Sequence, residues 1–189
     1  METSDLAVVT TSQLAVLTTA QMAAMTTTQV VGLGSTQVSV LTTKQLAAMT
    51  TTQIAAMEAT DLAAITTANI TGLTTAQVAG MGTTQVSSLT TSQLVAMTTA
   101  QIAAIETADV AAMGTTQVAA LTTAQVVGLG STQISSMTTT QLVAMTTAQI
   151  AAMQTADVAA LGTTQVASLT TTQLVSATTA QIAGLTTAQ

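Results

Sequence analysis

Residues 122–129 read Thr-Thr-Ala-Gln-Val-Val-Gly-Leu, and this octapeptide decides the fold because the chain is built from about 23 copies of it. The copies follow one another from Glu2 to Gln189 without an insertion or a deletion. We number the positions of the octad from 1 (Thr122) to 8 (Leu129). A short and strict period predicts one local structure that is repeated and stacked along the chain.

The composition suits a narrow stack better than a thick globular core. The 189 residues include no Phe, Tyr, Trp, Pro, Cys or His, and Val, Ile, Leu and Met supply about two large apolar side chains per octad. A thin core is sufficient in a repeat array, because each unit contacts only its neighbours. We therefore predict a single repeat-array domain over residues 1–189.

Positions 1 and 4 of the octad carry the signature of a helix start. Thr-x-x-Gln is the capping-box pattern, in which the Thr hydroxyl accepts from the Gln N–H and the Gln side chain reaches back to the Thr N–H. Position 8 of one octad and position 5 of the next form the hydrophobic staple around this box, as Met97 and Ile102 do in one copy. Since nearly every octad repeats both devices, the sequence predicts one short helix per octad.

The predicted fold is an all-α solenoid of very short capped helices. A new cap arrives after every eighth residue, which leaves room for about one and a half helical turns. Positions 5 and 8 share a helix face, and their packing against other octads must stabilise helices that would be unstable alone. A β-solenoid is the alternative because Thr, Val and Ile favour strands, although the apolar residues do not alternate with period two.

A longer rhythm predicts how many octads form one coil of the solenoid. In every third octad from Gly34 onward, position 1 holds a glycine in alternation with Glu or Gln instead of threonine. These residues are Gly34, Glu58, Gly82, Glu106, Gly130 and Gln154. The interval predicts three octads per coil and a duplicated unit of six octads. Gly114 and Gly162 interrupt the pattern. Two octads per coil is the alternative, because all five glycines at position 1 lie an even number of octads apart.

The glycines at position 1 also suggest a shift of the helix cap. We expect Gly34 and Gly130 to end the preceding helix in the left-handed conformation, as glycine does in many helix C-caps. Ser35 and Ser131 would then be the N-caps of the helices that follow.

The charge and hydropathy patterns exclude several kinds of partner. The net charge is −6 with Lys44 as the only cation, whereas binding to phosphates needs clustered Lys and Arg, so we predict no nucleic-acid partner. No stretch approaches the roughly 18 apolar residues of a membrane span, so we predict no membrane insertion. Residues 1–5 are acidic where a signal peptide would be basic, which predicts no signal peptide in this chain.

We predict no catalytic, cofactor-binding or metal site. The acidic pairs Glu58/Asp61 and Glu106/Asp109 are the best candidates, but calcium needs six or more oxygens and the pairs are six octads apart. We interpret each Asp as a first-turn residue that the helix dipole favours. Thr and Ser nucleophiles would need a base and the chain has no His, while Lys44 is expected at the surface.

Two further sets of residues have structural interpretations. The methionines occupy apolar positions of the octad and are predicted to fill the core. They are Met22, Met25, Met49, Met57, Met81, Met97, Met113, Met137, Met145 and Met153. Apart from Lys44, positions 2 and 3 hold Thr, Ser or Ala and are expected to face outward, so that stacked coils present rows of hydroxyl and methyl groups.

Octads of the form Leu-Thr-Thr-Ala-Gln-Val-Ala-Ala resemble the repeat tracts of very large secreted or surface proteins of bacteria, of the haemolysin-type or adhesin-like kind. The resemblance covers the whole chain and implies an extracellular spacer or stalk. It does not imply folding driven by calcium, because the Gly-Gly-x-Gly-x-Asp nonapeptides of such proteins are absent.

Together these observations predict a structural repeat module of a larger extracellular bacterial protein, and no enzyme. One alternative is a regular Thr-rich face that binds ice or a polysaccharide. Another is a designed or consensus-like scaffold, although imperfect copies of the six-octad unit favour natural duplication. Because no terminal octad carries an obvious capping substitution apart from Glu2 and Asp5, we also expect end-to-end self-association.

Overall fold

The computed structural model describes residues 9–185, and within this range it contains helices and no strand. Each octad between residues 10 and 185 forms one helix of three to six residues. The prediction of an all-α solenoid with one short helix per octad is therefore confirmed, and the β-solenoid alternative is wrong for the described residues.

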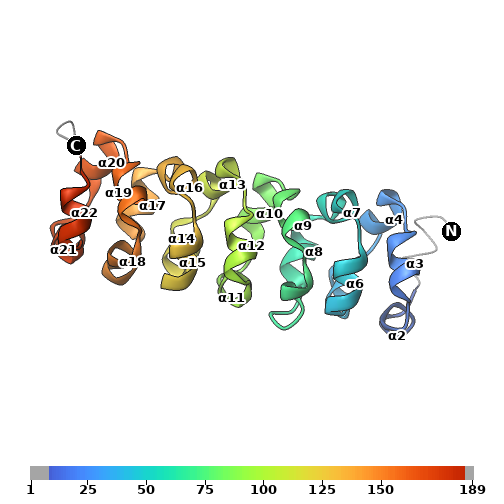
Figure 1. The fold of residues 1–189 in the computed structure, drawn as a ribbon. Coiled ribbons are helices and arrows are strands. Elements are labelled where there is room, and N and C mark those ends of the chain that lie inside the picture. The colour runs from blue at the N-terminus through green and yellow to red at the C-terminus, as the bar shows by residue number, and fades with distance from the viewer. Residues whose placement is uncertain (1–8, 186–189) are drawn as a thin grey trace. The chain divides into compact units, whose positions relative to one another are not determined.

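The chain divides into two compact units, Met1–Ile105 and Glu106–Gln189, shown in blue to green and in yellow-green to red in Figure 1. The described helices of the first unit are α2 (Thr11–Ala15), α3 (Thr19–Ala23), α4 (Thr27–Val31), α5 (Ser35–Val38), α6 (Thr43–Ala48), α7 (Thr51–Ala56), α8 (Ala59–Ala64), the 3₁₀ helix η1 (Ile70–Gly72), α9 (Thr75–Ala79), α10 (Thr83–Ser88), α11 (Thr91–Ala96) and α12 (Thr99–Ala103). Those of the second unit are α13 (Thr107–Ala112), α14 (Thr115–Ala120), α15 (Thr123–Gly128), α16 (Ser131–Ser136), α17 (Thr139–Ala144), α18 (Thr147–Ala152), α19 (Thr155–Ala159), α20 (Thr163–Ser168), α21 (Thr171–Ser176) and α22 (Thr179–Ala183). The single domain expected over residues 1–189 stays a prediction.

Two extended residues make the corner between successive helices. In the octad of residues 90–97, Thr90 is extended (φ −71°, ψ 153°), α11 follows, and Met97 is extended again (φ −63°, ψ 147°). The next helix begins one residue after the next N-cap, Thr98. Because no described residue has a positive φ, the corner needs no left-handed residue and any L-amino acid can occupy it.

Helices pack against the helix three octads away. In the first unit α3 contacts α6, α4 contacts α7 and α5 contacts α8 (Figure 1). In the second unit α14 contacts α17, and α15 contacts α18. The prediction of three octads per coil is therefore confirmed within each unit, and the alternative of two octads per coil is wrong.

Positions 5 and 8 fill the interior of each coil. Leu94 at position 5 is fully buried, and Met97 at position 8 is 3% exposed. The methionines were predicted to fill the core, and all ten are buried except Met25, which is half-buried. The thin core that the composition suggested is thus a continuous row of two apolar residues per octad.

The expected left-handed glycines are wrong. Gly34 (φ −96°, ψ 166°) and Gly130 (φ −86°, ψ 162°) are extended N-caps, and the helices begin directly after them at Ser35 and Ser131. Position 8 already ends the preceding helix, so that no left-handed residue is needed. The extended conformation also directs the Gly34 N–H to Oε1 of Gln37 at 2.9 Å, so that the glutamine half of the capping box is kept.

None of the helices between residues 9 and 185 has the length and hydropathy needed to cross a membrane.

Candidate functional site

The position-4 glutamines cap the helices, as the Thr-x-x-Gln pattern predicts. In α11, the Gln93 N–H donates to Oγ1 of Thr90 at 3.1 Å, and the Thr90 N–H donates to Oε1 of Gln93 at 2.8 Å. These two bonds satisfy backbone groups that have no partner inside the helix. They use only the oxygen of the Gln93 amide, although the side chain is just 1% exposed.

The amide nitrogen of the same glutamine binds the preceding coil. Nε2 of Gln93 donates to the carbonyl oxygens of Leu62 at 2.8 Å and Ile65 at 2.7 Å, which lie 31 and 28 residues earlier. In the second unit, Nε2 of Gln141 donates in the same way to Val110 and Met113. The acceptors are positions 5 and 8 of the octad four places earlier, at the corner where one helix ends and the next begins.

We call this set of glutamines the glutamine ladder, because each member donates to the carbonyls at positions 5 and 8 of the octad four places earlier. Its members are Gln45, Gln53, Gln77, Gln85, Gln93, Gln101, Gln141, Gln149, Gln173 and Gln181. The carbonyl of Leu62 also accepts from the N–H of Ile65 at 3.2 Å, so the amide is a second donor to position 5. The carbonyl of Ile65 at position 8, beyond the end of the helix, accepts from the amide of Gln93. Among the described residues, no buried side-chain nitrogen or oxygen lacks a hydrogen bond.

The Thr-x-x-Gln pattern predicted the capping role of these glutamines but not their role between coils. A signal was present in the residue type. Glu serves a capping box as well as Gln does, yet no octad has Glu at position 4. The choice of an amide over a carboxylate indicates that position 4 must donate as well as accept.

Two of the aspartates that replace glutamine at position 4 have a serine partner one coil earlier. Asp61 accepts a hydrogen bond from Oγ of Ser35 at 2.8 Å, and Asp157 accepts one from Oγ of Ser131 at 2.8 Å. Both carboxylates are at most 4% exposed. A carboxylate cannot donate to the carbonyls of the preceding coil, and the serine hydroxyl supplies a donor to the carboxylate instead. Ser35 and Ser131, expected as N-caps, are in fact these donors.

Asp109 lies in the first turn of α13, as expected, and is also buried. Burial raises the pKa of its carboxyl above 3.8, and the nearby charge of Glu106 raises this pKa further. Glu106 itself is exposed, as is Glu58. Between residues 9 and 185, no three His, Cys, Asp or Glu side chains gather closely enough to hold a metal ion.

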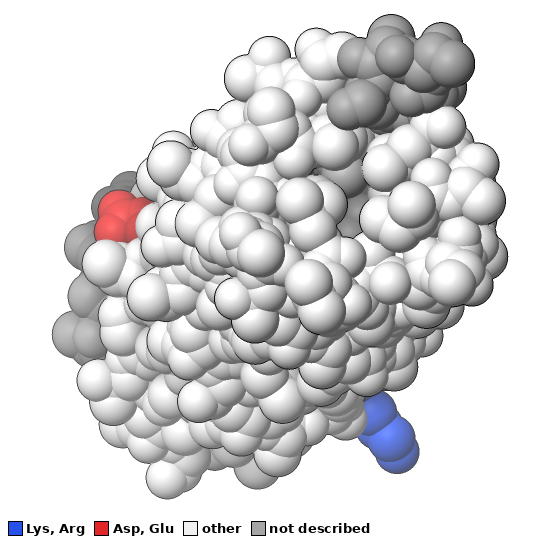
Figure 2. Space-filling model, turned by 90° about the vertical axis from the view of Figure 1, so that its left-hand side faces the viewer, with Lys and Arg blue, Asp and Glu red and all other residues white. Residues whose placement is uncertain are grey.

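The surface is almost free of charge. Figure 2 shows a face on which red and blue appear only at two places near the outline. Lys44, the only Lys or Arg of the chain, is exposed as predicted. Positions 2 and 3 are also exposed in most octads, as Thr99 and Ala100 illustrate. The described surface therefore offers hydroxyl and methyl groups and few ionic contacts.

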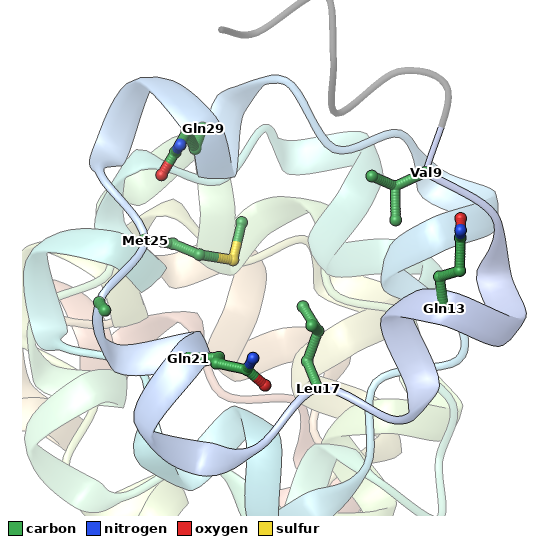
Figure 3. Close-up of a pocket in the computed structure, with 7 residues that line it drawn as sticks. Val9, Gln13, Leu17, Gln21, Met25 and Gln29 are labelled. Carbon is green, nitrogen blue, oxygen red and sulfur yellow. The ribbon is translucent and has the colours of Figure 1, made fainter. Parts of the chain in front are cut away.

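A hollow of about 400 Å³ opens on the first described coil. It is lined by Val9, Gln13, Leu17, Gln21, Ala24, Met25 and Gln29. Figure 3 shows that these side chains come from three successive sides of one coil, with Leu17 and Met25 near the centre of the opening. None of these seven described residues has a titratable side chain.

A family model described as the ALTTAQ repeat matches the chain seven times. The matched stretches are residues 1–35, 25–51, 54–91, 102–139, 127–155, 136–171 and 150–187. The chain belongs to the ALTTAQ repeat family. The predicted octapeptide repeat tract is thereby confirmed, and the ALTTAQ repeat chain is a structural repeat protein. A comparison with curated proteins finds none that is similar to it.

Replacing one member of the glutamine ladder of this ALTTAQ repeat with glutamate separates its two roles. In Gln93→Glu the capping oxygen is kept, but a carboxylate faces the Leu62 and Ile65 carbonyls. We expect the free energy of unfolding to fall by at least about 2 kcal/mol, because a buried charge replaces a donor. Chemical denaturation at neutral pH measures the change.

Gln13→Glu is the matched control, because Gln13 has the same capping bonds but is exposed and donates to no described carbonyl. This change should alter stability by less than about 0.5 kcal/mol, as exposed substitutions usually do. Equal effects of the two changes would show that the bonds between coils contribute nothing.

The octad of residues 66–73 offers the opposite test, because Asn69 stands at position 4. The Asn69 side chain forms no cap bond, and the octad forms the 3₁₀ helix η1 in place of an α-helix. Asn69→Gln should restore the cap and reach the carbonyls of Val38 and Leu41, which hold positions 5 and 8 of the octad four places earlier. We expect about 1–2 kcal/mol of added stability from these hydrogen bonds.

Denaturant midpoints measure this gain, and circular dichroism should show more α-helix. Ala68→Gln, which adds the same side chain at the neighbouring exposed position, should change stability by less than about 0.5 kcal/mol. A gain in stability in Ala68→Gln as large as in Asn69→Gln would contradict the expectation that the new hydrogen bonds stabilise the protein.

Proposed function

We propose that this array is a stiff structural module without catalytic activity, which holds other parts of a larger secreted bacterial protein apart. The observation that carries the proposal is the glutamine ladder. Each coil is attached to the previous one by buried amide bonds as well as by its two apolar rows, and the attachment is the same from coil to coil. A spacer needs this property, since its length then grows in proportion to the number of octads.

The remaining features support a passive role. Apart from Lys44, the exposed positions 2 and 3 carry small uncharged side chains. The buried Asp61 and Asp157 are held by serine hydroxyls, and the described residues that line the hollow include no titratable group. The extracellular location and the bacterial origin are part of the proposal and rest on the likeness of the octads to repeat tracts of large bacterial surface proteins.

Distances between spin labels test the stiffness of the first unit. The chain has no cysteine, so Thr19→Cys and Thr91→Cys, both exposed, allow specific labelling. These sites lie three coils apart on the same side, which corresponds to about 30 Å at typical helix packing distances. We expect one narrow distance distribution, because neighbouring coils share core and amide bonds.

The same labelled protein in concentrated urea is the control and should give a broad distribution. A broad distribution without urea would contradict the spacer proposal.

The rows of exposed threonines support a second candidate function, the binding of ice or a polysaccharide. Thr43, Thr67 and Thr91 occupy position 2 on one side of consecutive coils, where Thr67 and Thr91 are exposed and Thr43 is half-buried. On this side η1 packs against both α6 and α11. Threonine hydroxyl and methyl groups thus recur once per coil along this side. Such regularity is what a crystalline or polymeric ligand requires.

If this face binds ice, the wild-type protein should show thermal hysteresis, and Thr67→Lys, which interrupts the row, should reduce it. Nanolitre osmometry measures the effect. Absence of hysteresis in the wild-type protein at millimolar concentration would remove ice binding, and glycan-array binding would then test the polysaccharide alone.

A further inference from the structure

The first described coil presents amide groups without acceptors. Gln13 and Gln21 accept the cap bonds of Thr10 and Thr18 through Oε1, but their Nε2 atoms have no acceptor among residues 9–185. Both side chains are exposed, whereas the members of the glutamine ladder are buried. Leu17, which lies between them, and Met25, which follows Gln21, are half-buried, although position 8 is otherwise buried in most coils.

We call the surface formed by Val9, Gln13, Leu17, Gln21 and Met25 the amide face. Figure 3 shows its side chains around the open end of the coil. In the later coils of the first unit, this same surface of the octad packs against the corner of the preceding coil. The amide face is therefore a coil–coil interface on which no coil lies among the described residues.

The second unit presents the complementary surface. Leu174 and Ile182 stand at position 5, but they are 38% and 46% exposed, whereas position 5 is at most 7% exposed from Leu14 to Val166. The position-5 and position-8 carbonyls of these octads, those of Leu174 and Ala177 and of Ile182 and Leu185, accept no side-chain amide from the described residues. We call these four residues the carbonyl face.

We propose that the amide face of one copy of this chain binds the carbonyl face of another, so that copies associate head to tail and continue the solenoid. The register follows the glutamine ladder, in which each glutamine meets the octad four places earlier. Nε2 of Gln13 then donates to the carbonyls of Leu174 and Ala177, and Nε2 of Gln21 donates to those of Ile182 and Leu185. Leu17 and Met25 cover the exposed Leu174 and Ile182.

The chemistry of the two faces selects a second copy as the partner. The amide face needs carbonyl pairs three residues apart beside apolar side chains, which is the pattern that one octad presents. Neither face includes a charged residue, and Figure 2, which views the molecule from the side where α21 and α22 lie in Figure 1, shows a surface almost free of charge. Because a face one coil wide is small, we expect weak binding, with a Kd of roughly micromolar to millimolar.

Sedimentation velocity over a concentration series tests the proposal with the whole chain. The average mass of the wild-type protein should rise with concentration. In Gln13→Glu/Gln21→Glu the caps are kept, because Glu suits a capping box, but carboxylates face the partner's carbonyls and association should weaken at least tenfold. A strictly monomeric wild-type protein at millimolar concentration would overturn the proposal.

Ser12→Glu/Ala20→Glu is the matched control, because it adds the same charges to the exposed flank of the same two helices. This variant should associate as the wild type does. An equal loss of association in both double variants would assign the effect to net charge and contradict the two faces.

A mixing experiment tests the head-to-tail geometry. Leu174→Glu/Ile182→Glu blocks the carbonyl face, and Gln13→Glu/Gln21→Glu blocks the amide face. Each variant alone should remain monomeric, and their mixture should form dimers and nothing larger, since only one pair of intact faces is left. Larger species in the mixture would show that association uses another surface. The spacer role does not depend on this proposal. A strictly monomeric protein with a narrow distribution of spin-label distances would contradict head-to-tail association and leave the spacer role intact.

Discussion

The carboxamide of position 4 is the group on which the structure depends. An octad offers only two large apolar side chains, and its helix is too short to be stable alone. One amide stabilises two helix ends. Its oxygen accepts a hydrogen bond at the start of its own helix, and its nitrogen donates to carbonyls at the end of a helix in the preceding coil. Without the nitrogen, the corner carbonyls of Leu62 and Ile65, for example, would lose a hydrogen-bond donor inside the array.

Departures from the consensus support this account. Where Asp61 or Asp157 replaces the amide, a serine hydroxyl 26 residues earlier donates to the carboxylate. Where Asn69 replaces it, the side chain is one methylene shorter, the cap bond is missing and the helix tightens to 3₁₀. The glycines at position 1 remove the threonine hydroxyl and yet keep the bond from their own N–H to the glutamine, as at Gly34. The array thus tolerates loss at position 1 more readily than at position 4.

The use of the position-4 amides as links between coils is typical of a scaffold. In this array the position-4 amides hold coils together, and apart from Lys44, Glu58 and Glu106 the exposed polar side chains are mostly small, uncharged and repetitive. Adding whole octads to the array leaves the existing contacts between coils unchanged, because each glutamine amide donates only to the corner four octads earlier. The amide face and the carbonyl face follow from the same rule, since the bonds that join one coil to the next are also those that a second copy can offer.

The sequence by itself predicted the helices and the caps with threonine at position 1, and it favoured three octads per coil over two. The helices and caps depend on contacts within one octad and its neighbour, and the count depends on a visible interval, such as the three octads from Gly34 to Glu58. Only the tertiary structure decided that the glutamine amides are buried donors, that Ser35 belongs with Asp61, and that Gly34 is an extended cap. The reason is physical. A side chain between coils meets residues that are three or four octads away in the sequence, and their placement depends on how the coil closes.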